Sequence, residues 1–174
     1  MTMTLIETKT LGTAAASIEF TSIPQTYTDL YLLVSGRSTG TVATGGGVLF
    51  IRPNGSSANA SIRRLQGNGS TVSSSTDTNL LGRITPTDWT SNTFGSTSVY
   101  IPNYAGATNK SFNIDAINEQ NATEAVQSII AGLWSNTAAI TSLLLVPESG
   151  NLVAGSTISL YGITKGTDGI VVVS

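Results

Sequence analysis

Two apolar runs near the C-terminus constrain the fold of this chain more than any other feature. They span 140–147 and 156–163, both are rich in β-branched or aromatic residues, and the turn-like segment 148–155 separates them. In the second run Ile158 and Leu160 alternate with residues that bear hydroxyl groups. Such alternation gives one face to a core and the other to water or a partner. The pattern predicts a β-hairpin at the centre of an all-β core.

Further strand patterns recur along most of the chain. Apolar runs bounded by Gly, Pro and Asn predict strands at 5–11, 17–20, 29–35, 48–52, 97–101, 111–117, 139–146 and 156–165. With one ambiguous segment added, we expect eight or nine strands. The length of 174 residues suits a single domain. The sequence therefore predicts one β-sandwich over residues 1–174, with a jelly-roll-like order.

The ambiguous segment is 124–134. Val126, Ile129 and Leu133 fit a helical spacing, and Glu124 lies near a helix start. Gly132 interrupts that pattern, and a strand pattern follows closely. We favour a strand that pairs with its successor, with a helix as the alternative.

A polar insertion, at about 56–93, separates the predicted strands and has little periodicity. Insertions of this length inside a compact domain are uncommon and often functional. We expect it to cover one end of the sandwich or to contact other subunits, with a surface loop of no role as the alternative. Ile62 and Leu65 could form a short helix or strand within it, and so could Leu80 and Leu81. Trp89 is the candidate for an exposed binding anchor, whereas Trp134 lies in an apolar run and is expected in the core.

The composition favours assembly over chemistry. Only 10% of residues are charged, against about 25% in ordinary domains. A neutral, hydroxyl-rich surface suits a protein packed against copies of itself or other proteins, although a merely neutral soluble domain would look similar. The eight basic residues are scattered, so nucleic-acid binding is not expected. We expect no membrane span and no signal peptide, because no apolar run approaches the required length and the N-terminus lacks a basic region.

Catalytic groups are scarce in the sequence. The chain has no His and no Cys, which excludes Ser-His-Asp and Cys-His arrangements and thiolate or imidazole metal sites. Lys110 and Ser111 are neighbours, but adjacent strand residues point to opposite faces. Asp77 and Asp88 lack the spacing of a calcium loop. We expect no enzyme, no metal, no cofactor and no small-molecule substrate.

Five stretches resemble a family of small virion structural proteins of tailed bacteriophages. These stretches are Ile18–Leu30, Phe50–Gly55, Ile101–Ala105, Gly132–Ser142 and the closing run Gly155-Ser-Thr-Ile-Ser-Leu-Tyr-Gly-Ile163. Members of that family are similar to β-sandwich proteins of the virion surface, some of which decorate or cement capsids while others sit in tail fibres. The family has no catalytic residues to carry over.

The resemblance implies a capsid decoration (cement) protein on the virion surface, assembled in the cytoplasm of the host bacterium. Its implied partners are the major capsid protein and copies of itself, as a homotrimer at symmetry axes. The alternative is a tail fibre or spike module that binds a host receptor or carbohydrate. Besides the insertion, the apolar tail 169–174 is a candidate for partner contacts. The candidate partner-binding residues are Leu80, Leu81, Trp89, Ile170, Val171, Val172 and Val173.

Overall fold

The computed structural model describes residues 2–41, 46–121 and 124–165, and every regular element in these ranges is a β-strand. The twelve strands in this part of the chain are β1 (Thr2–Thr10), β2 (Ile18–Phe20), β3 (Asp29–Gly36), β4 (Gly47–Pro53), β5 (Ala60–Gly67), β6 (Val72–Asp77), β7 (Leu81–Ile84), β8 (Gly95–Pro102), β9 (Lys110–Glu119), β10 (Ala125–Trp134), β11 (Leu143–Pro147) and β12 (Thr157–Thr164). The prediction of an all-β protein is confirmed. The number of strands exceeds the eight or nine that we expected.

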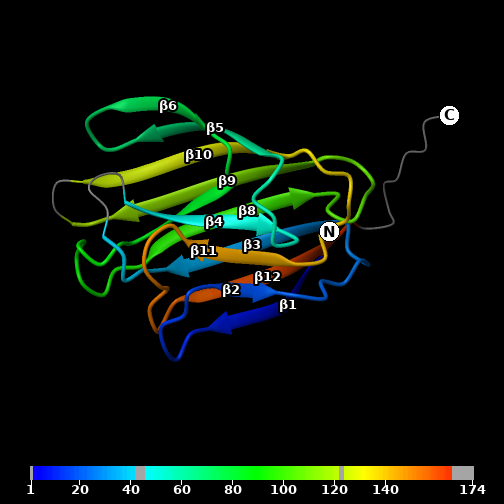
Figure 1. Cartoon of the computed structure of the whole chain (residues 1–174), viewed down its shortest axis with the longest axis horizontal. Helices are drawn as coiled ribbons and strands as arrows, with labels where there is room; N and C mark the ends of the chain where they lie inside the picture. Colours follow the sequence, from blue (N-terminus) through cyan, green and yellow to red (C-terminus); the bar gives the residue numbers. More distant parts are fainter. Residues whose placement is uncertain (1, 42–45, 122–123, 166–174) are drawn as a thin grey trace.

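The strands form two antiparallel sheets that pack as a β-sandwich. The larger sheet has eight strands in the order β1-β12-β3-β8-β9-β10-β5-β6, and the smaller has four in the order β2-β11-β4-β7. In Figure 1 the arrows of β2, β11 and β4 run over the larger sheet, while β5 and β6 extend past the smaller sheet. The sandwich is thus confirmed, and a jelly-roll order remains a prediction.

One hydrophobic core lies between the two sheets and draws on both. Strand β9 shows how the sequence builds it, because Phe112, Ile114 and Ala116 are buried while the residues between them are exposed. Leu49 of β4 and Leu145 of β11 contribute from the smaller sheet. The period-two alternation that predicted these strands therefore also identifies which face of each is buried.

The predicted C-terminal hairpin is wrong. Strand β11 pairs with β2 and β4 in the smaller sheet, and β12 pairs with β1 and β3 in the larger sheet. The segment between them crosses from one sheet to the other instead of turning back. Its path is held in part by backbone hydrogen bonds between Ala15 and Leu152 (Leu152 N to Ala15 O, 2.8 Å).

The segment at about 56–93 has more regular structure than we expected, although short strands at Ile62 and Leu65 and at Leu81 had been allowed for. It contains β5 and β6, which extend the larger sheet beyond β10, and β7, which extends the smaller sheet beyond β4. Strand β6 escaped the sequence analysis because all six of its residues are exposed. An edge strand with two wet faces needs no apolar periodicity.

The ambiguous segment 124–134 is strand β10, so the preferred interpretation as a strand is confirmed. Its partner was predicted wrongly. Strand β10 pairs with β9 before it in the chain and with β5, rather than with its successor. This placement makes β10 an interior strand of the larger sheet.

The turn after β4 follows the expected chemistry of its Pro-Asn-Gly sequence. Asn54 adopts a φ of 51°, a conformation that Asn tolerates better than most residues. Its side chain accepts hydrogen bonds from the backbone N–H of Thr141 (2.8 Å) and Ser142 (3.1 Å) and donates one to the carbonyl of Ala139 (2.9 Å). Asn54 thereby joins the end of β4 to the segment that leads into β11.

We expect Asn54→Ala to lower the free energy of unfolding by about 1–2 kcal/mol, because it removes four hydrogen bonds, the three above and one from the Thr141 hydroxyl, and strains a positive φ. Asn54→Gly loses the same hydrogen bonds but tolerates the positive φ, so its stability should fall between those of the parent and Asn54→Ala. Urea unfolding followed by circular dichroism measures both. Equal stability of Asn54→Ala and the parent would contradict the bridging role.

Candidate functional site

The outer face of the larger sheet, opposite the smaller sheet, is the candidate site. Its three central rows, followed through the strand register, are Leu5, Tyr161, Tyr31, Tyr100, Asn113, Ala131, Arg63, Thr76; Thr8, Ser159, Leu33, Ser98, Asp115, Ile129, Leu65, Ser74; and Thr10, Thr157, Ser35, Ser96, Ile117, Gln127, Gly67, Val72. We call this surface the open face. It spans all eight strands.

Large apolar side chains concentrate at the β9-β10-β5-β6 end of the open face. Val72 is 75% exposed, Ile129 is 55% exposed and Leu65 is 52% exposed, and Ile117 and Leu133 are exposed beside them. Ile129 and Leu65 are direct neighbours across β10 and β5. We call the outer surface of these four strands the apolar half.

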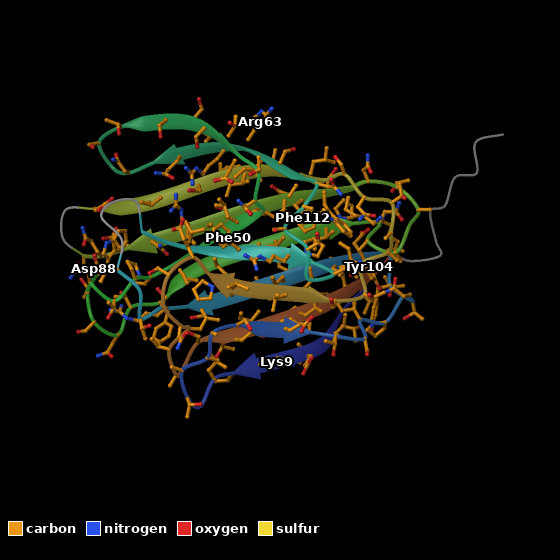
Figure 2. The ribbon with its side chains drawn as sticks, viewed as in Figure 1. Lys9, Phe50, Arg63, Asp88, Tyr104 and Phe112 are labelled. Atoms are coloured by element: carbon orange, nitrogen blue, oxygen red, sulfur yellow. The ribbon has the colours of Figure 1, made fainter. Side chains whose placement is uncertain are left out.

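A hollow of about 420 Å³ lies on the apolar half, where β10, β5 and β6 meet. Its walls include the apolar side chains of Leu65, Ile129 and Ala131 together with Arg63 and Thr76. Figure 2 shows Arg63 at this end of the molecule, far from Lys9 on β1. The hollow is open to solvent. Apolar side chains line one part of it, and hydroxyl groups from β6 line another.

Charge is sparse on the open face. Within its three rows the charged residues are Arg63 of β5 and Asp115 of β9. Neither forms an ion pair with another described residue. The two charges are of opposite sign and lie on either side of β10, so this part of the face is neutral as a whole.

The opposite half of the open face is mainly aromatic and hydroxylic, with Leu5 and Leu33 as its exposed apolar side chains. Tyr161, Tyr31 and Tyr100 stand side by side on β12, β3 and β8, each half-buried. Next to them Thr8 and Ser159 share a hydrogen bond of 2.9 Å, and so do Thr10 and Thr157 at 3.0 Å. These pairs join β1 to β12 through their side chains as well as their backbones.

The tyrosine row is fixed at one end by a buried carboxylate. Asp29 accepts a hydrogen bond from the Tyr100 hydroxyl (2.8 Å) and another from the Asn103 N–H (2.9 Å), and Lys165 lies 3.7 Å away. Burial, and after it the hydrogen bond to Asp29, raises the pKa of Tyr100 above its ordinary value. Tyr100 therefore acts as a neutral donor, and its ring is held in place on the face.

The structure buries three of the residues predicted to bind partners. Trp89 is only 7% exposed, and Leu80 and Leu81 are also in the interior, so the expectation that Trp89 is an exposed anchor is wrong. The reason is Arg37, whose guanidinium donates to the carbonyls of Trp89 and its neighbours and draws their loop onto the sandwich. Leu80 packs close to Gly132 of β10. None of the three belongs to the open face.

The other four predicted residues, Ile170, Val171, Val172 and Val173, lie outside the described residues. The sequence analysis predicted that one face of 156–163 meets water or a partner, and its Thr157, Ser159 and Tyr161 lie on the open face, but it missed the apolar half. Its signal was present in β10, where Ile129 and Ile130 are adjacent: apolar residues in both phases of a strand indicate two apolar faces. In the sequence analysis we treated these apolar residues as possible evidence for a helix.

Groups that could support catalysis stay separate in the described part of the chain. Lys110 is buried, its Nζ donates to the carbonyls of Gly106 (2.7 Å) and Thr108, and burial lowers its pKa. Ser111 is exposed on the other face of β9. Arg83 is buried as well, which lowers its pKa to about 10, and it donates to the carbonyl of Gly46 (3.2 Å) and to Gln66. These cations contact backbone and amide oxygens.

No set of three or more residues among His, Cys, Asp and Glu gathers into a metal site in the described ranges. Those ranges also hold no helix that is long and apolar enough to cross a lipid bilayer. Comparisons with protein-family models, curated proteins and solved structures find no match to this chain. The open face is therefore interpreted from its own chemistry.

Proposed function

We propose that this protein is a non-enzymatic structural subunit of a tailed-phage virion, a capsid decoration protein that binds copies of itself and the major capsid protein and stabilises the head. One observation carries the proposal. The open face presents exposed apolar, aromatic and hydroxyl side chains across eight strands with two charges in its three central rows.

The physical argument begins with the cost of leaving such a surface in water. Monomeric proteins rarely expose contiguous apolar patches larger than a few hundred Å². Covering a surface like this one releases water from apolar groups without the penalty of desolvating many charges. Depletion of charged residues and enrichment of aromatic residues are typical of the cores of protein–protein interfaces.

The place of that assembly comes from the sequence. The resemblance to virion surface proteins suggests the capsid exterior and assembly in the bacterial cytoplasm. A non-enzymatic role is supported by the lack of His and Cys and by the separation of Lys110 from Ser111 across the two faces of β9. Stabilisation of the head would follow from bridging, because each copy that binds two capsid subunits adds an interface to the shell.

A second candidate function is favoured by the tyrosine row. Tyr161, Tyr31 and Tyr100 form a half-exposed aromatic strip beside hydroxyl groups, and such strips can stack against sugar rings while hydroxyls bond to them. A tail fibre or spike module that binds a receptor or carbohydrate would use this strip.

Copy number in purified virions tests the two candidates. We expect a decoration protein at hundreds of copies per particle, measured by quantitative mass spectrometry against the major capsid protein. A tail module would be present at a few to some tens. We also expect heads that lack the protein to break more readily under heat or osmotic shock. Absence of the protein from virions would overturn the proposal, and so would equal survival of such heads.

A further inference from the structure

We propose that a second copy of this chain covers the apolar half together with the outer surface of β8, face to face, around a twofold axis that runs along β10. The role of this dimer in the virion rests on the proposed function, under which the dimer would be the unit that binds the capsid. The proposal itself rests on the position of the exposed apolar residues, the area of the surface and the placement of its two charges.

The exposed apolar side chains define the centre of the contact. Val72, Ile129 and Leu65 are more than half exposed, and the strand register places them on three adjacent strands, β6, β10 and β5. Ile129 lies on β10, with apolar neighbours on both sides in Leu65 and, one row away, Ile117. On a twofold axis along β10, Ile129 of one copy would meet Ile129 of the other.

The surface is large enough for a stable pair. With strands about 4.8 Å apart and about 3.3 Å per residue, the outer face of β8, β9, β10, β5 and β6 covers about 650 Å². That is close to the ~800 Å² that each partner contributes to an ordinary stable interface. Two sheets can pack in this way at the usual separation of about 10 Å.

The charges on this surface are complementary to themselves. Arg63 and Asp115 lie on β5 and β9, the two neighbours of β10. A twofold axis along β10 places β5 of each copy over β9 of the other. Arg63 then lies about 7 Å along the strand from the position opposite Asp115, a distance that its side chain spans. The same pair forms twice, as a twofold interface requires.

This arrangement gives a dimer rather than the trimer that the resemblance implies. A twofold contact uses the same patch on both copies and closes after two. A trimer needs two different patches on each copy. Ile129, Arg63 and Asp115 belong to one patch, in which Ile129 meets its own counterpart and Arg63 reaches Asp115 of the other copy.

Sedimentation equilibrium of the purified full chain tests the pair. We expect a dimer at micromolar concentration. Ile129→Lys places two lysines at the axis and should raise the dissociation constant by about 100-fold or more. The far-UV circular dichroism spectrum should not change, because Ile129 is exposed in the single chain. Thr10→Lys, on the far side of the open face, is the matched control and should not change the dissociation constant. A monomer, a trimer, or a dimer that persists in Ile129→Lys would overturn the proposal.

A charge exchange tests the axis. Arg63→Asp and Asp115→Arg should each raise the dissociation constant by about tenfold, and the double variant should restore it to within about threefold of the parent. Single variants that weaken the dimer without recovery in the double variant would overturn the axis along β10.

The two proposals fail separately. A monomeric chain that is found on heads in hundreds of copies would overturn the pair and leave the decoration role standing. A dimeric chain that is absent from virions would overturn the decoration role and leave the pair standing. A dimer that glycans dissociate would favour a sugar as the occupant of this surface and overturn the pair as its functional state.

Discussion

Arg37→Ala is expected to lower the free energy of unfolding by about 3 kcal/mol or more and to release the loop that holds Trp89. The buried guanidinium of Arg37 donates to the carbonyls of Thr90 (2.8 Å), Trp89 (3.0 Å), Thr93 (3.0 Å) and Thr87 (3.1 Å). Hydrogen bonds from a charged donor contribute about 1.5–3 kcal/mol each. Alanine removes all four and leaves a cavity where the guanidinium was.

Two measurements check this prediction. Urea unfolding gives the loss of stability, and acrylamide quenching in a Trp134→Phe background reports whether Trp89 has become accessible. Arg37→Lys is the matched control, because it keeps the charge but loses the planar fork that reaches several carbonyls at once. It should fall between the parent and Arg37→Ala. A protected Trp89 with stability within about 1 kcal/mol of the parent would contradict the anchoring role.

The loop around Trp89 also shows why part of the candidate site could not be predicted. Its sequence, Asp88 to Thr93, is polar and has no periodicity, so it indicates an exposed loop. The interactions that bury Trp89 come from Arg37, more than 50 residues earlier in the chain. Nothing local to either segment marks them as partners, because backbone carbonyls are present in every sequence.

The positions of strands were predictable where one face of the strand is buried and the other is exposed. In β9 the alternation of Phe112, Ile114 and Ala116 with polar residues gives both the strand and its buried side. Strand pairing was not predictable in the same way. The runs that became β11 and β12 have the composition of a hairpin, but each finds its partners elsewhere. Pairing depends on contacts that are distant in sequence, whereas propensity is local.

The open face was predictable only in part. Its apolar residues are visible in the sequence, since Ile129 in β10 and Leu33 in β3 occupy positions out of phase with the core. What the sequence does not give is the register that brings them onto one surface. Only when Leu65 pairs with Ile129 across β5 and β10 do scattered residues become a contiguous patch. A site of this kind is a property of the sheet.

Trp134→Ala is expected to lower the free energy of unfolding by about 3–5 kcal/mol, the range for truncating a large aromatic side chain in a core. Trp134 is 1% exposed and ends β10 beside Lys110 and Ala60. Its Nε1 has no acceptor among the described residues, so Trp134→Phe removes an unpaired donor together with part of the ring.

The losses of unfolding free energy in Trp134→Ala and Trp134→Phe should therefore differ sharply. Trp134→Phe keeps most of the buried apolar area and should cost less than about 1.5 kcal/mol, although the smaller ring leaves some empty space. Urea unfolding of the two variants under the same conditions measures the difference. Equal losses would mean that the indole N–H has a partner that stabilises the fold. In that case a polar contact as well as packing would hold the end of β10. That contact would also make the adjacent edge of the apolar half more rigid than packing alone does.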